Sequence, residues 1–337
     1  MENMKVVRAF GPQDLRVVEE PIPTPGAGEV LLRVRASGIC GSDKWYWFVP
    51  AYSQAVAGHE ACGEVVAVGA GVHSLREGDR VAVNNVVGCG HCPACRAGAF
   101  VRCPNWDGSR DVNHGYSEYL VTPARNCLRL HDSLSFLQGC LIMDNWGTPF
   151  AALQRLPEVA GTDVLVSGCG PVGLAAVALA SAMGAAVLAV DPVAERRAAA
   201  LALGAREALE PGDGLPERVR ERTDSLGVHS VLECSGNSRA YEPGLRALRI
   251  GGNLVTIGEH AEYLLQPSEL VLRRHLGILG SFYSTMAQGA QVQRMAVSGD
   301  IQLEALVSHT VSLEQVPGIF GQVVAMGGGI RKCVILM

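Results

Sequence analysis

Two different patterns of apolar and polar positions divide the sequence near residue 150. In the first part, short Val-rich apolar runs are separated by Gly and Pro, which predicts β-strands joined by long loops. The clearest of these runs lie at 29–39, 61–72, 78–87 and 116–123. This part of the chain is therefore expected to be β-rich.

From residue 163 onward, apolar runs of strand length alternate with stretches of helical length, the first of which is an Ala-rich segment at 171–183. Such alternation predicts βαβ units and hence an α/β fold with a parallel, doubly wound sheet. After about residue 284 one helical stretch and two β-like segments, at 306–313 and 332–337, end the chain.

The composition narrows the class of protein. With 337 residues, 48% of them hydrophobic, the chain is long enough for two domains with sizeable cores. A net charge of −5 and the lack of a Lys/Arg-rich run argue against nucleic-acid binding. Glycines and a proline interrupt the uncharged stretch 164–190, so we do not expect a membrane span. Eleven cysteines, an odd number, and an N-terminus without an apolar signal segment favour the reducing cytoplasm.

A glycine-rich motif, GCGPVG, follows the first apolar strand of the α/β part and opens a helix. Its glycines permit a tight turn, close approach of a pyrophosphate and close packing of the helix, whose free N–H groups attract the anion. The motif therefore predicts a dinucleotide-binding loop. The residues expected at the cofactor are Gly168, Gly170, Pro171, Val172 and Gly173.

Asp191 ends the next expected strand, where a carboxylate accepts hydrogen bonds from the adenosine ribose hydroxyls. Because this carboxylate would repel the 2′-phosphate of NADP, we expect NAD to be the preferred cofactor. Arg196 follows shortly after and is expected beside the same ribose, although a solvated arginine at a helix start is the competing interpretation.

Four cysteines lie close together in the stretch GCGHCPACRAGAFVRC, namely Cys89, Cys92, Cys95 and Cys103. Their spacing lets one loop fold around a tetrahedral zinc ion whose four positions are all filled by thiolates. Disulfides would suit a small secreted domain, and a redox pair would belong to a thioredoxin-like context that this loop lacks. We therefore expect a structural zinc site that does no chemistry.

A second, dispersed set of possible ligands consists of Cys40 in GICGSD and His59 in GHEACG, each at the end of a strand-like stretch. These residues are followed in order by the four-thiol loop, the glycine-rich loop and Asp191. The chain thereby resembles the zinc-containing medium-chain dehydrogenase/reductase family, the alcohol and polyol dehydrogenases, over essentially its whole length.

The resemblance implies two domains. A GroES-like catalytic domain would span 1–150 and be completed by 285–337, and a Rossmann dinucleotide-binding domain would span 151–284. The resemblance also implies two zinc ions per chain and NAD as the cofactor. A homodimer or homotetramer is expected, because the last sheet strand in this family, here near 276–282, commonly pairs across a two-fold axis and covers an exposed edge.

The family's catalytic zinc is held by a Cys, the His of GHE and a variable third residue, which the resemblance assigns here to Cys40, His59 and Asp144. Cys140, four residues before Asp144, is the competing candidate. Glu60 is expected either to join the metal transiently or to orient the site from outside it. Three protein ligands leave one position open, where zinc can polarise a substrate oxygen.

The resemblance makes the hydroxyl of Ser42 the acceptor of the alcohol proton, which then passes to the nicotinamide ribose. Many relatives carry a His three residues later, whereas this chain has Trp45, so the end of the relay is left open. Asp43 is expected to be a structural hydrogen-bonding residue. Cys234 is expected to be a small packed residue beside the nicotinamide.

Aromatic residues of the run KWYWF at 44–48, together with Trp146, Phe282 and Tyr283, are candidates for the walls of a substrate pocket, against simple packing. The predicted reaction is hydride transfer between NAD and a small-molecule secondary alcohol that resembles a polyol, sugar or cyclitol, which becomes a ketone. A primary-alcohol dehydrogenase or aldehyde reductase, and a non-catalytic nucleotide-binding protein on the same scaffold, are the alternatives.

Overall fold

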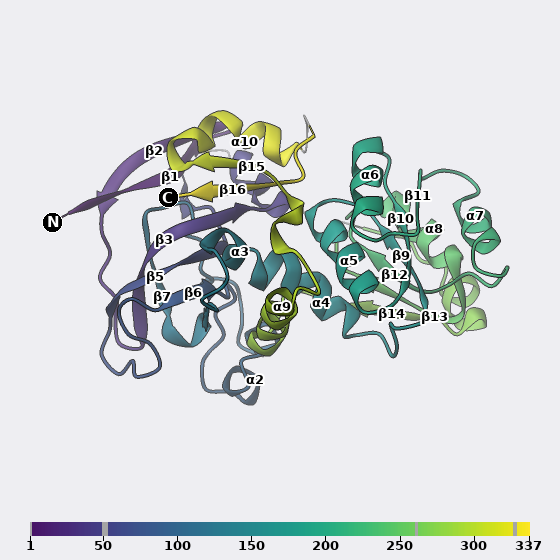
Figure 1. The fold of residues 1–337 in the computed structure, drawn as a ribbon, viewed down its shortest axis with the longest axis horizontal. Coiled ribbons are helices and arrows are strands. Elements are labelled where there is room, and N and C mark those ends of the chain that lie inside the picture. Colours follow the sequence, from purple (N-terminus) through teal and green to yellow (C-terminus); the bar gives the residue numbers. More distant parts are fainter. Residues whose placement is uncertain (1, 49–52, 260–261, 326–328) are drawn as a thin grey trace. The chain divides into compact units, whose positions relative to one another are not determined.

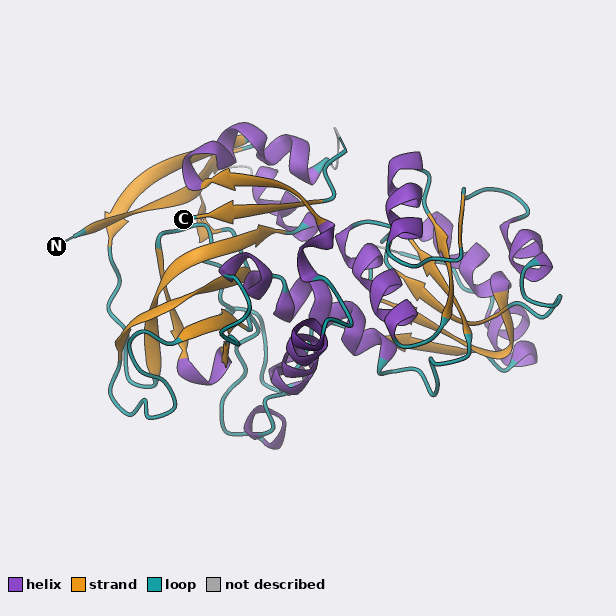
Figure 2. Cartoon of the chain, in the orientation of Figure 1, coloured by secondary structure: helices purple, strands orange, loops and turns teal. Residues whose placement is uncertain are grey.

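The computed structural model describes residues 2–48, 53–259, 262–325 and 329–337. The chain divides into two compact units: unit 1 comprises Met1–Gly147 with Tyr283–Met337, and unit 2 comprises Thr148–Phe282. Unit 1 is dominated by strands and long loops, whereas strands and helices alternate in unit 2 (Figure 2). Among the described residues, no helix combines the length and apolar character that crossing a membrane requires.

Unit 2 is built on a six-stranded parallel sheet with the strand order β11-β10-β9-β12-β13-β14. The strands are β9 (Asp163–Ser167), β10 (Ala186–Val190), β11 (Glu207–Leu209), β12 (Val228–Glu233), β13 (Leu248–Thr256) and β14 (Gly277–Gly280). Both central strands, β9 and β12, are buried and rich in Val and Leu, as strands covered on both faces must be. This order is that of a doubly wound dinucleotide-binding sheet, which confirms the predicted fold class.

Helices cover both faces of this sheet, with α5 and α6 on one side and α7 and α8 on the other (Figure 1). Their bounds are α5 (Pro171–Ala182), α6 (Ala194–Ala202), α7 (Leu215–Glu221) and α8 (Ser238–Ala247). α5 starts with Pro at its first helical position, where the missing N–H costs nothing. The glycine-rich loop therefore leads directly from β9 into the N-terminus of α5.

Unit 1 contains a largely antiparallel seven-stranded sheet and a three-stranded sheet of order β2-β1-β4. The larger sheet comprises β3 (Glu29–Ile39), β5 (Glu60–Val68), β6 (Arg80–Val83), β7 (Tyr119–Pro123), β8 (Cys127–Arg129), β15 (Val307–Ser312) and β16 (Lys332–Leu336). The smaller sheet comprises β1 (Asn3–Gly11), β2 (Asp14–Pro21) and β4 (Ser53–Val56). The principal helices are α1 (Lys44–Trp47), α2 (Pro93–Arg96), α3 (Phe136–Cys140), α9 (Met286–Ser298) and α10 (Val316–Val324).

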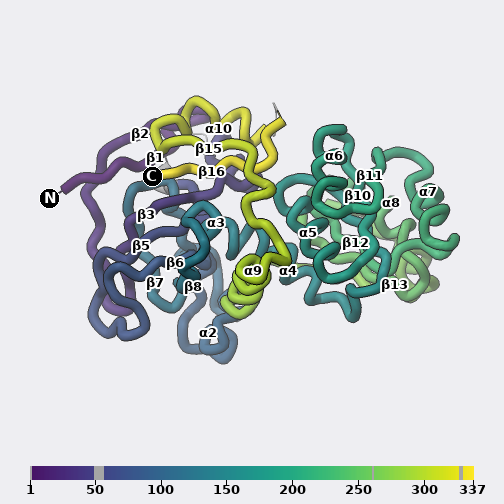
Figure 3. Tube along the Cα trace, in the orientation of Figure 1, coloured from purple at the N-terminus to yellow at the C-terminus, as the bar shows by residue number. Residues whose placement is uncertain are grey.

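The C-terminal strand β16 returns to the middle of the larger sheet and pairs antiparallel with β3, which precedes it by almost the whole chain (Figure 3). In this register Cys333 lies opposite Ile39. The first residue of β16 is thereby placed beside the end of β3. This long-range pairing places Lys332, at the start of β16, next to the end of β3 and the candidate site.

Candidate metal and cofactor sites

Three segments of unit 1 bring four possible metal ligands together. Cys40 follows β3, His59 and Glu60 lie where β5 begins, and Asp144 lies in the π-helical turn η4 (Ile142–Trp146). One ligand atom from each of these four residues lies within 4.8 Å of the other three. His59, Glu60 and Asp144 are buried, and Cys40 is partly buried.

Strand pairing explains why Cys40 and His59 meet. Gly38 of β3 lies opposite Glu60 of β5 in the antiparallel register, so the end of one strand adjoins the start of the other. Gly58, before the histidine, has a φ of +103°, and a Cβ there would lie 2.5 Å from the ring of Tyr116. Only glycine fits this turn, because any side chain would combine backbone strain with a collision.

The π-helical turn positions Asp144. The N–H of Trp146 donates to the carbonyl of Leu141 at 3.0 Å, five residues back, a spacing that often marks functional sites. The carboxylate oxygen Oδ2 of Asp144 lies 3.0 Å from Nε2 of His59. Trp146, predicted as a pocket wall, is 0% exposed, and its indole N–H donates to the carbonyl of Leu303 at 3.2 Å. Of the two interpretations left open by the sequence, simple packing holds for Trp146, which belongs to the core and anchors the turn.

Asp43 orients the histidine from behind. Its Oδ1 lies 3.2 Å from Nδ1 of His59, and its Oδ2 accepts hydrogen bonds from the backbone N–H of Cys40 at 2.9 Å and the hydroxyl of Tyr116 at 2.6 Å. Burial alone would lower the pKa of His59, but Asp43 and Cys40 outweigh it and raise the pKa well above its ordinary value. The surroundings of this imidazole are therefore negative, as a cation site requires.

The other residues predicted near this cluster differ in burial and in their distance from it. Cys140 is buried, and its thiol donates to the carbonyl of Leu137 at 3.2 Å, outside the four-residue cluster. Ser42 is exposed in the turn after Cys40, and Trp45 is 72% exposed. The ring of Tyr283 meets that of His59 edge-on, with 6.1 Å between centroids. Among these aromatics, Tyr283 contacts the cluster directly.

Two residues that sequence reasoning missed also support the cluster. Tyr116, the buried partner of Asp43, follows a Gly in a segment predicted merely as a strand. Lys332, on the last strand, donates to Oε1 of Glu60 at 2.5 Å. Neither stands near Cys40 or His59 in the sequence. The sequence does show a lysine at the start of an apolar, strand-like run, but the partner of this lysine depends on the register of the strands.

The four thiols of the loop around α2 form the second cluster, with their sulfurs within 4.8 Å of one another and no disulfide between them. The backbone N–H of Cys95 donates to Sγ of Cys92 at 3.4 Å, and that of Cys89 to Sγ of Cys103 at 3.3 Å. Backbone N–H groups of His91 and Cys92 lower the pKa of Cys89 to about 5. The backbone therefore favours the thiolate form at Cys89, whereas burial raises the pKa of Cys95 to about 12.

The glycine-rich loop of unit 2 leaves no space for a side chain at Gly168 or Gly173. Gly168 has a φ of +91°, and a Cβ there would lie 2.7 Å from the backbone of Ser235. A Cβ on Gly173 would lie 1.8 Å from the carbonyl oxygen of Gly168. Gly170 caps α5 in an extended conformation, with Pro171, Val172 and Gly173 forming its first turn. The N–H groups of this turn are the ones available to a pyrophosphate.

Asp191 follows β10 and is buried against this loop. Its Oδ2 accepts a hydrogen bond from the N–H of Cys169 at 2.8 Å, and its Oδ1 accepts one from the N–H of Val193 at 2.8 Å. Each carboxylate oxygen can accept a further hydrogen bond. Arg196 lies on the same side, with Nη1 3.9 Å from Oδ2 of Asp191. The structure thus brings both predicted ribose residues to the glycine-rich loop.

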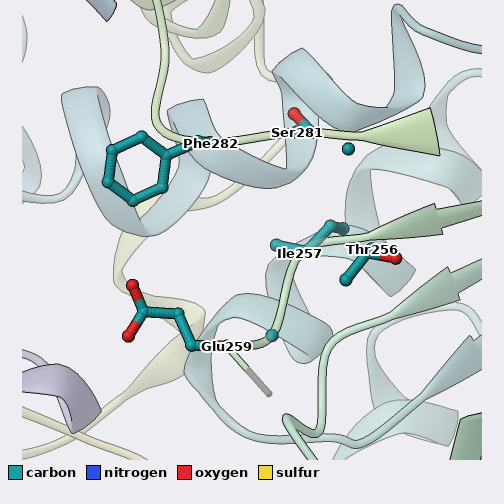
Figure 4. A pocket seen from close by; sticks show the side chains of 7 residues that line it. Thr256, Ile257, Glu259, Ser281 and Phe282 are labelled. Carbon is teal, nitrogen blue, oxygen red and sulfur yellow. The ribbon is translucent and has the colours of Figure 1, made fainter. Parts of the chain in front are cut away.

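An open hollow of about 580 Å³ lies at the carboxyl ends of β13 and β14 (Figure 4). Its lining residues are Thr256, Ile257, Gly258, Glu259, Gly280, Ser281 and Phe282. Ligands of open α/β sheets bind outside the carboxyl ends of the strands, which is where this hollow lies. Phe282, one of the candidate aromatic residues, lines this hollow of unit 2.

Comparison with known proteins assigns both parts of the chain. Residues 26–132 match the alcohol dehydrogenase GroES-like domain, and residues 171–298 match the zinc-binding dehydrogenase domain. A match at 34% identity, which covers 94% of this chain and 94% of a zinc-type alcohol dehydrogenase-like protein of Escherichia coli, spans both domains. The chain belongs to the zinc-type alcohol dehydrogenase family. The resemblance seen in the sequence is thereby confirmed.

Two further members of the family, one known by sequence and one by structure, indicate its range. Sorbitol dehydrogenase of Gallus gallus is 34% identical to this chain, and the match covers 95% of this chain and 94% of the sorbitol dehydrogenase. An alcohol dehydrogenase of Escherichia coli CFT073, solved with NADH, is 27% identical with a TM-score of 0.90 and full coverage of both chains. This chain is accordingly a zinc-binding oxidoreductase of the alcohol and polyol dehydrogenase type.

The donor sets of this dehydrogenase fit zinc at both clusters. Four thiols match a closed structural site, whereas Cys40, His59 and Asp144 supply the sulfur, nitrogen and oxygen donors that zinc accepts. Oε2 of Glu60 is buried beside these three residues without a hydrogen-bond partner in the described structure, which leaves it available to a cation.

Proposed function

We propose that this dehydrogenase oxidises a polyol-like secondary alcohol to a ketone, with NAD as the hydride acceptor. The observation that carries the proposal is the buried cluster of Cys40, His59 and Asp144, which provides three ligands and thus an incomplete shell. The similarity of the chain to sorbitol dehydrogenase, which acts on a polyol, supports the proposed substrate class. The cluster at Cys89, Cys92, Cys95 and Cys103 would hold a second, structural zinc.

Zinc bound at the three ligands would supply Lewis acidity to the substrate hydroxyl. Asp43 fixes the ring of His59 through Nδ1, so that Nε2 faces the ligand set. Ser42 then accepts the alcohol proton as the first relay hydroxyl. Because Ser42 is exposed and the indole of Trp45 cannot accept a proton, the proton continues through the cofactor ribose to water.

NAD is the proposed cofactor because Asp191 lies buried against the glycine-rich loop, where its charge disfavours a 2′-phosphate. Arg196 beside it is the residue that could weaken this preference. The hollow at the ends of β13 and β14 is a suitable site for the nicotinamide half, since it lies in the same sheet as the loop. Unit 2 is therefore proposed as the cofactor domain and unit 1 as the catalytic domain.

We further propose a homodimer or homotetramer in the cytoplasm. β14 lies at the edge of its sheet with Ile278 partly exposed, an edge that a second copy would cover. Cysteines without disulfides among the described residues are consistent with a reducing compartment.

A panel of alcohols tests the reaction. Zinc-loaded protein is incubated with sorbitol and related polyols, simple secondary alcohols and primary alcohols, and NADH formation is followed by absorbance with NAD and separately with NADP. We expect the highest kcat/KM with a secondary alcohol and NAD. Faster oxidation of primary alcohols would overturn the substrate class, a higher kcat/KM with NADP would overturn the cofactor, and no turnover at all would favour a nucleotide-binding protein.

A further inference from the structure

Glu233 is a fully buried glutamate at the carboxyl end of β12, one of the two middle strands of the sheet of unit 2. The other middle strand, β9, leads into the glycine-rich loop, and Glu233 lies opposite Ser167 in their parallel register. The direction in which the chain adds strands reverses between β9 and β12, and a dinucleotide binds across the crevice at such a point. Glu233 therefore lies beneath the expected cofactor site.

The carboxylate of Glu233 holds the turn that follows it in the chain. Its Oε1 accepts hydrogen bonds from the backbone N–H of Ser235 at 2.9 Å and from the hydroxyl of the same serine. Its Oε2 accepts one from the backbone N–H of Gly236 at 3.4 Å. These N–H groups belong to a turn, outside strand and helix, so they need an acceptor, and a buried carboxylate needs donors. The turn and the carboxylate thus satisfy each other.

The same residue holds a second loop through its backbone. The carbonyl oxygen of Glu233 accepts hydrogen bonds from the N–H groups of Ile257 and Gly258, each at 2.9 Å. Ile257, Gly258 and Glu259 line the open hollow at the ends of β13 and β14 (Figure 4). A single residue therefore connects the turn after β12 with the lining of the hollow.

The turn at 235–236 packs tightly against two loops of the expected cofactor site. A Cβ on Gly168, in the glycine-rich loop, would lie 2.7 Å from the Cα of Ser235. On the other loop, a Cβ on Gly258 would lie 2.3 Å from the nitrogen of Gly236. The backbones meet here without side chains between them, so the turn cannot move without shifting the glycine-rich loop or the loop at 257–259.

We propose that Glu233 is a positioning residue for the cofactor, whose carboxylate fixes the turn at 235–236 and thereby the shape of the glycine-rich loop and of the hollow before NAD binds. The inference rests on the proposed function, which places NAD on unit 2. Glu233 is 0% exposed and touches neither NAD nor substrate in this role. It raises the affinity for NAD because loops that are already ordered lose little conformational entropy on binding.

Glutamine is the most informative replacement, because it has the shape of glutamate but not its hydrogen-bonding capacity. The amide nitrogen of glutamine only donates, so in Glu233→Gln it would face the backbone N–H of Ser235 or of Gly236, donor against donor. The serine hydroxyl can rotate away, whereas the backbone N–H groups cannot. The substitution should therefore release the turn while the backbone bonds from Ile257 and Gly258 stay in place.

The test measures the Kd values of NAD and NADH by titration calorimetry on the full-length, zinc-loaded protein, without alcohol. We expect Glu233→Gln to raise both Kd values about 10- to 100-fold, as for a lost hydrogen bond to a buried charge, with zinc content unchanged. The KM for NAD should rise with the Kd, whereas kcat at saturating NAD should be nearly unchanged.

Thr223→Val is the matched control. Thr223 is buried in the same unit, and its hydroxyl accepts a hydrogen bond at 3.1 Å from the N–H of Gly227, in the turn at the opposite end of β12. Its loss should lower the Tm but leave the Kd of NAD unchanged. A merely structural role for Glu233 would make the two variants behave alike.

Ser235→Ala removes a single donor from the same contact and should raise the Kd of NAD about 2- to 10-fold. Because both substitutions act on one contact, Glu233→Gln/Ser235→Ala should bind NAD no more weakly than Glu233→Gln alone. Effects that multiply would show that Ser235 acts on NAD independently of Glu233, contrary to the proposal.

An unchanged Kd of NAD in folded Glu233→Gln, or an equal rise in Thr223→Val, would also overturn the proposal. If Glu233→Gln fails to fold, Ser235→Ala decides in its place, and an unchanged Kd there is equally contrary. Failure of the wild-type protein to bind NAD would instead refute the cofactor of the proposed function.

Discussion

Replacing Gly58 with alanine perturbs the catalytic cluster through a single, identifiable contact. The new Cβ would lie 2.5 Å from Cδ1 of Tyr116, 2.8 Å from its Cε1 and 2.8 Å from its backbone nitrogen. The ring must retreat by about 0.9 Å to reach an ordinary contact of 3.4 Å. A shift of that size would lengthen the hydrogen bond from its hydroxyl to Asp43 from 2.6 Å to at most about 3.5 Å and so weaken it, and Asp43 is the residue that holds His59.

Two contributions determine how much Gly58→Ala lowers the free energy of unfolding. A φ of +103° in a non-glycine residue costs about 1–2 kcal/mol, and overpacking a buried site costs about 1–3 kcal/mol. We therefore expect a loss of roughly 2–5 kcal/mol in the free energy of unfolding. Selective loss of the catalytic zinc should accompany it, because the histidine loses its support.

Gly71→Ala is the matched control, since its φ of +77° imposes similar strain but nothing lies within 4 Å of the added Cβ. Thermal unfolding and zinc content are measured for both variants. Gly71→Ala should lose only about 1–2 kcal/mol and keep both zinc ions. If Gly58→Ala matched Gly71→Ala in both measurements, the contacts that link Tyr116 to His59 would not stabilise the metal site, and the reasoning would be refuted.

Four other substitutions separate the roles of the two clusters and the relay. Cys95→Ser should lose one zinc per chain and lower the Tm, because metal binding by the closed shell is part of the folding free energy; full zinc content would contradict the structural site. Asp144→Ala should lose activity and the other zinc while the fold stays intact. Cys140→Ser should keep activity and that zinc. If Cys140→Ser lost them and Asp144→Ala kept them, Cys140 would be the third ligand in place of Asp144. Ser42→Ala should lower kcat by roughly 10²-fold, and an unchanged kcat would remove it from the proton path.

The local pattern of apolar and polar residues is sufficient to predict those helices and strands whose structure depends on a few neighbouring residues. β3 spans Glu29–Ile39, as expected from its apolar run, and α5 begins at Pro171, inside the glycine-rich motif. β1 and β2 were not singled out, because their mixed polar and apolar residues leave β2 only partly buried. These strands become recognisable only through their pairing with each other.

The contacts that hold the candidate site depend on long-range register instead. Nothing near Lys332 in the sequence indicates Glu60 as its partner, because the contact exists only when Cys333 pairs with Ile39. A slip of one residue would point the lysine to the other face of the sheet. The sequence leaves the role of Trp146 open for a related reason, since the π-helical turn that buries it has no simple sequence signature.

The transfer of a single deuterium atom tests the central claim most directly. A secondary alcohol deuterated at its carbinol carbon is incubated with NAD and the zinc-loaded protein, and the reduced cofactor is weighed by mass spectrometry. Hydride transfer at the Cys40/His59/Asp144 site predicts that each reduced cofactor carries one deuterium, and that Asp144→Ala forms almost none. Reduced cofactor without deuterium, or an equal yield from Asp144→Ala, would contradict the account.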